Sequence, residues 1–296
     1  MPRLTIGLII YNGADSARVC IDSLLGQTYT DLELLIFDNG STDGTSEICA
    51  EYAAKDARVR HVRHPETLPQ SVNFRGVLMA AQTEYFMWAA DDDIWGPRFA
   101  ELCIAQLDAA PEAVACCTKV MFRYPDGDER PARGTFPIQG TPVQRVEIYL
   151  RNPRDSARLY GVYRTPGLQA SYPEGVSMFA YDWLVVCLSM LQGDHLEVDD
   201  FQLLRSGHAP GKYFEKYDRH FVRERGLTGA LSWALPLMPL TKALKQHLPA
   251  SAWRKAFWRI VRLNAHQTLL LLKWKFPVLE GIFAAVKWAD RTLVKS

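Results

Sequence analysis

The feature that most constrains the fold is a regular alternation of strand and helix patterns over the first hundred residues. Short apolar runs rich in β-branched residues are typical of strands buried in a parallel sheet, and each is followed by a helical pattern. The four runs are Leu4–Tyr11, Leu32–Phe37, Val59–Val62 and Glu84–Ala90. The order βαβαβαβ predicts an α/β fold with a mainly parallel, Rossmann-like sheet, right-handed crossovers and helices on both faces.

The middle of the chain has a less regular pattern. Val114–Tyr124 is typical of a strand, Val143–Leu150 fits either a helix or a strand, and Ser177–Leu191 predicts a helix with Asp182 near its start. Beyond about Gly211 the composition changes to Trp, Leu, Lys and Arg. We therefore expect two parts. Residues 1–210 form the main domain, with halves at about 1–100 and 101–210, and residues 211–296 form a helical extension.

Charge is distributed unevenly along the chain. Residues 1–100 carry 8 Lys and Arg against 14 Asp and Glu, whereas residues 241–296 carry 11 against 2. The acidic N-terminal part and the basic C-terminal part suggest separate roles, with the C-terminal part facing an anionic partner. The six cysteines form no CxxC pair, and most lie in apolar runs, which predicts buried free thiols in a reducing cytoplasm.

Two polar clusters directly follow predicted strands. Asp38-Asn39-Gly40-Ser41 follows the second strand, and Asp91-Asp92-Asp93 follows the fourth. Ligands of parallel α/β sheets bind beyond the carboxyl ends of the strands. We therefore expect both clusters at one sheet edge, as parts of one site.

The three adjacent aspartates repel one another, and a divalent cation would relieve that repulsion. Oxygen ligands select hard ions such as Mg²⁺ or Mn²⁺, which can hold a diphosphate and neutralise its charge as it leaves. The alternative is a solvated acidic turn or a helix cap. Asp38 is placed to accept hydrogen bonds from a base or ribose, but the turn Tyr11–Asp15 contains no GxGxxG, which disfavours an NAD(P)-dependent oxidoreductase.

Together these residues resemble glycosyltransferase family 2, inverting enzymes of the GT-A fold that use nucleotide-activated sugars. The resemblance covers roughly Leu4 to His208. Its motifs, taken in order, are Thr5–Asn12, Gln27-Thr28-Tyr29, Asp38–Thr45 and Tyr85–Pro97.

The resemblance implies roles for several residues. Asp38 would read the nucleobase, and Asn39 would also bind the nucleotide. The Tyr11-Asn12 backbone would line the nucleotide pocket, and Asp91 with Asp92 would form the metal and ribose pair. Asp92 is the first choice for the direct metal ligand and Asp93 the second, with Mn²⁺ or Mg²⁺ as the ion.

Three further positions match places where the family carries functional residues. Asp182, in Tyr181-Asp182-Trp183, would be the catalytic base that takes a proton from the acceptor hydroxyl; the alternative is an acid in the first turn of a helix. Asn73 would lie near the nucleotide or be a polar residue on a helix face. His208 would lie near the diphosphate or metal or be an ordinary loop histidine.

The C-terminal extension contains a basic amphipathic helix. Over Ser251–Asn264, one side carries apolar side chains and the other carries basic ones. The apolar side comprises Trp253, Phe257, Ile260, Val261 and Leu263, and the basic side comprises Lys255, Arg259 and Arg262. The pattern predicts that residues 251–296 bind an anionic membrane surface, or that the helix packs on the main domain. No nucleic-acid recognition motif is present.

The sequence thus predicts a metal-dependent enzyme that transfers a sugar from a nucleotide donor, expected to be a UDP-sugar, to a glycan or lipid-linked acceptor in surface polysaccharide synthesis. No window reaches the roughly 20 apolar residues of a spanning helix, so the expected location is cytoplasmic, at the inner face of the membrane. The alternative is a non-catalytic, membrane-tethered module that binds a nucleotide or a glycan.

Overall fold

A computed structural model of the chain describes residues 2–151, 153–155, 157–173, 178, 180–207 and 235–276. The chain divides into two compact units. The first comprises Met1–Ser177 and Tyr181–Gly207, and the second comprises Met178–Ala180 and His208–Ser296. His208, like residues 209–234 and 277–296, lies outside the described residues.

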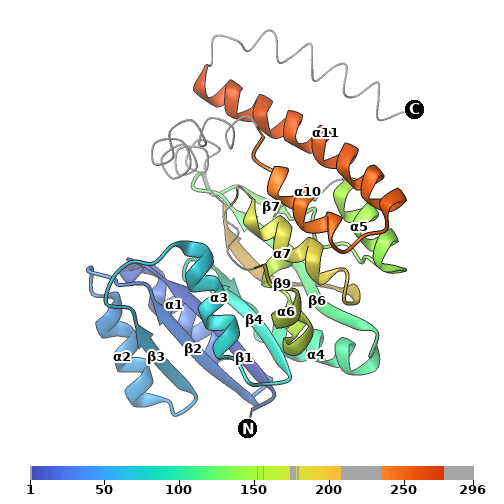
Figure 1. Ribbon diagram of the computed structural model, residues 1–296. Helices are drawn as coiled ribbons and strands as arrows, with labels where there is room; N and C mark the ends of the chain where they lie inside the picture. The colour runs from blue at the N-terminus through green and yellow to red at the C-terminus, as the bar shows by residue number, and fades with distance from the viewer. Residues whose placement is uncertain are drawn as a thin grey trace. The chain divides into compact units, whose positions relative to one another are not determined.

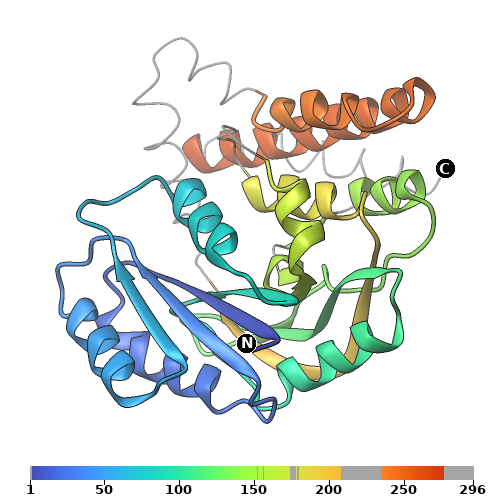
Figure 2. The same ribbon diagram turned by 60° about the horizontal axis from the view of Figure 1, so that its bottom comes forward.

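The first unit begins with the predicted alternation of strands and helices (Figure 1). Its elements are β1 (Leu4–Ile10), α1 (Ala14–Leu25), β2 (Leu32–Asp38), α2 (Thr45–Lys55), β3 (Val59–Arg63), α3 (Gln70–Ala80) and β4 (Tyr85–Ala90). These four strands pair in parallel in the order β3-β2-β1-β4. Figure 2 shows α1 and α2 on one face of these strands and α3 on the other. The expected parallel sheet with helices on both faces is confirmed for this half.

Apolar side chains of β1 and β4 explain why these segments form central strands. Both β1 and β4 are buried along almost their whole length, so each strand needs apolar side chains on both faces. Trp88 of β4 lies at the centre of an aromatic cluster, with its ring centroid 5.0 Å from that of Phe86 and 6.2 Å from that of Tyr163. Its indole Nε1 donates to the carbonyl of Phe74 at 3.1 Å, which ties α3 to the sheet.

The second half of the first unit extends the same sheet with mixed strand directions. Its elements are β5 (Ile94–Trp95), α4 (Phe99–Ala109), β6 (Ala113–Arg123), β7 (Glu129–Pro131), α5 (Pro142–Arg151), η1 (Ala157–Tyr160), β8 (Val162–Arg164), α6 (Thr165–Ser171), α7 (Tyr181–Ser189) and β9 (Asp194–Ser206). Within the described residues the sheet has nine strands in the order β3-β2-β1-β4-β8-β6-β9-β5, with β7 paired to β6. The segment that fits either a helix or a strand, Val143–Leu150, is the helix α5.

All six cysteines are buried and free, as the sequence predicts. Burial raises the pKa of the Cys117 thiol to about 12, which keeps it protonated and unreactive.

The second unit contains α10 (Met238–Lys245) and α11 (Ala250–Lys275), which pack on each other. The amide of Leu237 donates to Asn264 Oδ1 at 2.7 Å, and Trp253 Nε1 donates to the carbonyl of Thr241 at 3.2 Å. Ile260 of the predicted apolar side is fully buried. Leu263 is buried as well, whereas Trp253, Phe257 and Val261 are partly exposed, so protein covers part of that side.

Other side chains of α11 remain at the surface. Trp258 is 68% exposed, and Arg254, Lys255 and Arg262 are exposed as well. Among the described helices, none has the length and apolar character needed to cross a membrane.

Candidate active site

The carboxyl ends of β2, β1 and β4 lie side by side and carry the predicted polar clusters. In the sheet register Ile10 of β1 is opposite Asp38 of β2, and Ile9 of β1 is opposite Ala90 of β4. The segments that follow these strands, Tyr11–Gly13, Asn39–Thr45 and Asp91–Asp93, consequently meet at one edge. The structure thus brings together two clusters that are separated by about fifty residues in sequence.

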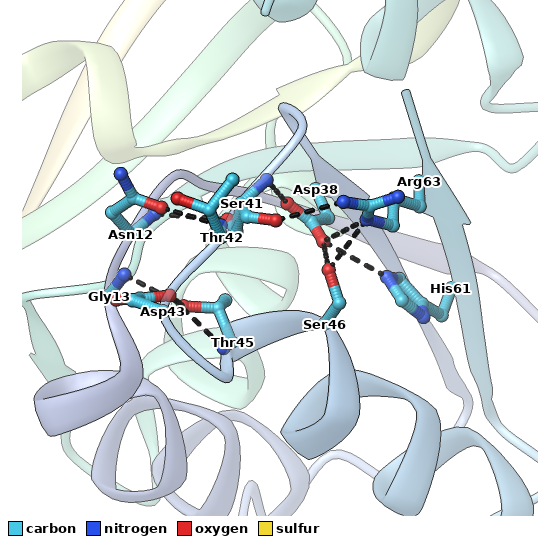
Figure 3. A network of polar contacts seen from close by, with 10 residues as sticks. All are labelled: Asn12, Gly13, Asp38, Ser41, Thr42, Asp43, Thr45, Ser46, His61 and Arg63. Atoms are coloured by element: carbon cyan, nitrogen blue, oxygen red, sulfur yellow. Dashed lines mark hydrogen bonds and ion pairs between the residues drawn. The ribbon is translucent and has the colours of Figure 1, made fainter. Parts of the chain in front are cut away.

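Asp38 is the centre of a polar network at this edge (Figure 3). Its carboxylate is completely buried and accepts hydrogen bonds from the amide of Ser41, at 2.9 Å, and from the Ser46 hydroxyl. His61 Nε2 and Arg63 Nε of β3 lie 3.7 and 3.8 Å from its Oδ2. Burial alone would raise the pKa of Asp38, but these hydrogen bonds outweigh it and hold the pKa below its usual range. Asp38 is therefore an ionised group that fixes the loop after β2.

Asn39 is clamped to a second loop. Its side-chain amide donates to the carbonyl of Leu68 at 3.0 Å and accepts from the amide of the same residue at 2.9 Å. Asn73 of α3 is 1% exposed, and its Oδ1 lies 3.0 Å from His64 Nε2. The Nδ2 of Asn73 is buried and has no hydrogen-bond partner within the described chain, so it is a donor available to a ligand.

The turn after β1 is held by the loop after β2 (Figure 3). Asn12 has a positive φ of 50°, which asparagine tolerates better than most residues. Its amide donates to Ser41 Oγ at 3.0 Å, and its Oδ1 accepts from the amide of Thr42 at 2.9 Å. The amide of Gly13 donates to Thr45 Oγ1 at 2.9 Å. The side chain of Tyr11 is 49% exposed beside this turn.

Asp91 lies directly against Gly13. A Cβ atom added at Gly13 would lie 1.9 Å from Asp91 Oδ2, so only glycine allows this carboxylate its position. Burial, followed by the charge of Asp92, raises the pKa of Asp91 to about 6. The carboxylate is thus held in a place where its charge is costly and where a cation or hydrogen-bond donor would stabilise it.

Asp93 is buried, and both of its carboxylate oxygens are bound by residues of β9. Its Oδ2 accepts from Arg205 Nε at 2.7 Å, and its Oδ1 accepts from the amide of Ser206 at 3.0 Å. Asp92 instead lines an open pocket of about 210 Å³, whose wall also includes Tyr124, Arg205 and Ser206. The three aspartates are therefore not equivalent.

Asp182 lies in the first turn of α7, as the sequence predicts. Burial raises the pKa of Tyr160 in η1 to about 12, with the charge of Arg205 opposing the shift and the charges of Asp93, Asp92 and Asp182 adding to it. The charges of Asp93, Asp92 and Asp182 therefore act in the same direction on the Tyr160 hydroxyl.

The residues fit a divalent cation held jointly with a ligand. The described side chains include no group of three or more His, Cys, Asp or Glu residues arranged to hold a metal. Mg²⁺, however, is commonly bound by one or two carboxylates together with substrate phosphates. The charge of Asp92 contributes to the raised pKa of Asp91, and a cation beside the two carboxylates would relieve that repulsion.

Sequence reasoning missed several residues of this site. Gly13, Arg205 and Tyr160 hold or surround the predicted aspartates, and His64 holds Asn73. For Arg205 a signal existed, since it is a basic residue only three positions before His208. No sequence pattern connects Tyr160 to the triplet.

Comparison with known proteins agrees with this fold. The pattern of glycosyl transferase family 2 matches residues 5–180. An uncharacterized glycosyltransferase of Escherichia coli K12, YibD, is 28% identical over 167 residues, which are 55% of this chain and 48% of YibD. The chain thus spans about half the length of this curated relative.

Two solved structures share the fold. TarS residues 1–349 of S. aureus in complex with UDP has a TM-score of 0.57 and 16% identity, over 92% of this chain and 91% of that one. The mannosyltransferase PcManGT of Pyrobaculum calidifontis in complex with GDP-Man and Mn²⁺ has a TM-score of 0.56 and 16% identity, over 100% and 81%. The expected GT-A fold is confirmed. The chain belongs to glycosyl transferase family 2.

Proposed function

We propose that the chain is an inverting glycosyltransferase that moves a sugar from a nucleoside diphosphate donor to a glycan or lipid-linked acceptor. The observation that carries the proposal is the meeting of the Asp38 loop, Asp91 and Asp92 at one sheet edge. The names of relatives support the reaction class, and the UDP and GDP-Man bound to the two structural neighbours support the donor class.

Each group has a role in this proposal. The loop held by Asp38, together with Asn39, Tyr11-Asn12 and the free donor of Asn73, binds the nucleoside. Asp91 and Asp92 hold Mn²⁺ or Mg²⁺, which supplies positive charge to the diphosphate. His208 is a further candidate metal ligand. Asp182 accepts the proton of the acceptor hydroxyl as its oxygen bonds to the anomeric carbon from the face opposite the diphosphate. The bond to the diphosphate oxygen breaks with its electron pair, so the configuration inverts and the nucleoside diphosphate leaves.

Donor binding and transfer can be tested separately. Thermal unfolding with UDP-, GDP- and dTDP-sugars and with NAD(P), each with and without Mn²⁺, should show metal-dependent stabilisation by a nucleotide sugar. A protein stabilised by NAD(P) alone would refute the assignment. Donor binding without release of nucleoside diphosphate, in the presence of membrane extracts as the acceptor source, would instead indicate a non-catalytic module.

The role of Asp182 has a matched control. Asp182→Asn should lower transfer at least ~100-fold while donor affinity stays within a few-fold, since a general base contributes about 10²–10⁴-fold to the rate. Glu47→Gln removes an exposed first-turn acid from α2 and should change neither quantity. If Asp182→Asn and Glu47→Gln change transfer and donor affinity equally, Asp182 is an acid in the first turn of a helix and not the catalytic base.

We further propose that residues 251–296 place the enzyme on an anionic membrane, where a lipid-linked acceptor for surface polysaccharide synthesis would lie. The exposed Trp258 and Arg254 on α11 support this proposal, because an aromatic ring beside basic groups suits the interface of an anionic bilayer. Trp258→Ala should reduce flotation with vesicles containing phosphatidylglycerol, and Arg18→Ala, on the first unit, should not. If the wild-type protein floats equally well with neutral vesicles and with vesicles that contain phosphatidylglycerol, the proposed role at an anionic membrane is contradicted.

A further inference from the structure

The end of β9 holds two of the three aspartates of the triplet. Arg205 Nε donates to Asp93 Oδ2 at 2.7 Å, and the Ser206 amide donates to Asp93 Oδ1 at 3.0 Å. The Ser206 hydroxyl donates to the main-chain carbonyl of Asp92 at 2.7 Å. Both oxygens of Asp93 and the backbone of Asp92 are therefore bound by two consecutive residues that lie 112 to 114 positions further along the chain.

The sheet register explains why Arg205 reaches Asp93. The short strand β5 follows the triplet at once and pairs antiparallel with β9, with Ile94 opposite Leu204. One further step along both strands brings Asp93 opposite Arg205. On its other side β9 pairs in parallel with β6, where Phe122 is opposite Arg205. The position of Arg205 is thus fixed by main-chain pairing on both sides.

The ion pair between Arg205 and Asp93 lies in the interior. The Arg205 side chain is 13% exposed and that of Asp93 is not exposed at all. The guanidinium carbon lies 3.9 Å from the centre of the Tyr160 ring and 5.6 Å from that of Phe122. Burying such a pair contributes little to stability, because desolvation offsets the attraction, and its best attested use is to select one conformation.

The conformation that the ion pair selects is the one in which Asp92 lines the pocket. Without Arg205 the buried Asp93 carboxylate would carry an uncompensated charge and would turn toward water, next to Asp91 and Asp92. With the pair formed, Asp93 is withdrawn and Asp92 lines the pocket together with Arg205 and Ser206.

We propose that Arg205 and Ser206 are positioning residues of the donor site. They hold the Asp93 carboxylate in the protein interior and fix the backbone of Asp92, so that the Asp92 side chain faces the pocket. Asp93 acts in this arrangement through Arg205 and does not bind the metal ion. The inference rests on the proposed function, because it concerns the binding of a nucleoside diphosphate and a divalent cation.

The test measures UDP binding with and without Mn²⁺ by calorimetry, alongside thermal unfolding. Arg205→Ala should weaken Mn²⁺-dependent UDP binding at least 10-fold, and Arg205→Lys should recover most of the loss, because an ammonium can still pair with Asp93. Ser206→Ala, which keeps the amide and removes the hydroxyl, should weaken binding by a smaller factor and leaves a measurable variant if Arg205→Ala does not fold. Arg123→Ala removes another arginine from the same pocket wall, one paired with Glu129, and is the control for charge alone.

Double substitutions separate positioning from metal ligation. Adding Asp93→Asn to Arg205→Ala should cause no further loss of Mn²⁺-dependent binding, because Asp93 has already lost its partner, whereas adding Asp92→Asn should cause at least a further 10-fold loss. A further loss with Asp93→Asn as large as that with Asp92→Asn, or a loss with Arg123→Ala as large as that with Arg205→Ala, would overturn the inference alone. Failure of the wild-type protein to bind any nucleotide with Mn²⁺ would overturn the proposed function, and this inference with it.

Discussion

Gly13 is the position where one added methyl group would test the arrangement of the candidate donor site. In Gly13→Ala the new Cβ would lie 1.9 Å from Asp91 Oδ2, 2.9 Å from its Cγ and 3.3 Å from Ile10 Cγ1. The backbone of Gly13 has a φ of −116°, which alanine adopts without strain. The conflict is therefore with the Asp91 carboxylate and not with the main chain.

The expected effect follows from this geometry. Restoring an ordinary contact would move the carboxylate oxygen by roughly 1.5 Å, and a displacement of even about 1 Å at a reacting centre can cost about 100-fold in rate. That factor corresponds to roughly 2.7 kcal/mol of transition-state stabilisation. The stability cost should be only about 1 kcal/mol, from the poorer helix cap, because a carboxylate at the end of a side chain can move aside.

The assay compares kcat/KM for donor consumption, the Kd for UDP with Mn²⁺, and the free energy of unfolding in urea. The matched control is Gly44→Ala in the loop after β2. Gly44 has a φ of 95° and no atom within 4 Å of an added Cβ, so alanine there costs about 1–2 kcal/mol of backbone strain without touching Asp91. Only Gly13→Ala should lose donor affinity and activity. Unchanged binding by Gly13→Ala, or an equal loss in Gly44→Ala, would refute the reasoning.

Two further substitutions examine the loop after β2. Asp38→Asn should lower the free energy of unfolding by about 1–3 kcal/mol at pH 7, because the Ser41 amide and the Ser46 hydroxyl lose a charged acceptor. Since the folded-state pKa of Asp38 is lowered, this contribution is present above the unfolded pKa of about 3.9 and is lost as the pH falls below it. Urea unfolding of both proteins near pH 3 should therefore show a smaller difference, and a constant difference would contradict the ionised state. Asn39→Asp should also destabilise at neutral pH, because a carboxylate cannot donate to the carbonyl of Leu68. Amide hydrogen exchange at Leu68 should report the loosened loop, and exchange at the wild-type rate would exclude the clamp.

Local sequence patterns predicted the first half of the fold well. Parallel strands covered on both faces need continuous apolar runs, so the four strands could be recognised without any long-range information. The second half was harder, because antiparallel and very short strands such as β5 and β8 carry almost no pattern of their own. Val143–Leu150 fits two periodicities, and packing decided between them.

The extension shows where a local pattern was insufficient. An amphipathic helix needs a surface to cover its apolar side, and the pattern does not state which surface that is. In the structure, Trp253 donates to the carbonyl of Thr241 and Ile260 is buried, so protein covers part of that side. In the described part of the extension, the exposed Trp258 and its basic neighbours remain available to a membrane.

The sequence by itself determined the residue types of the candidate site and their places after strands β2 and β4. Parallel strands start and end in register, so residues that follow them must share an edge. Only the tertiary structure decided how the three aspartates differ. Asp91 depends on the absence of a side chain at Gly13, and Asp93 depends on Arg205, more than a hundred residues away. These contacts arise from strand pairing between distant segments, and no local pattern in the chain encodes which distant residue a buried carboxylate will meet.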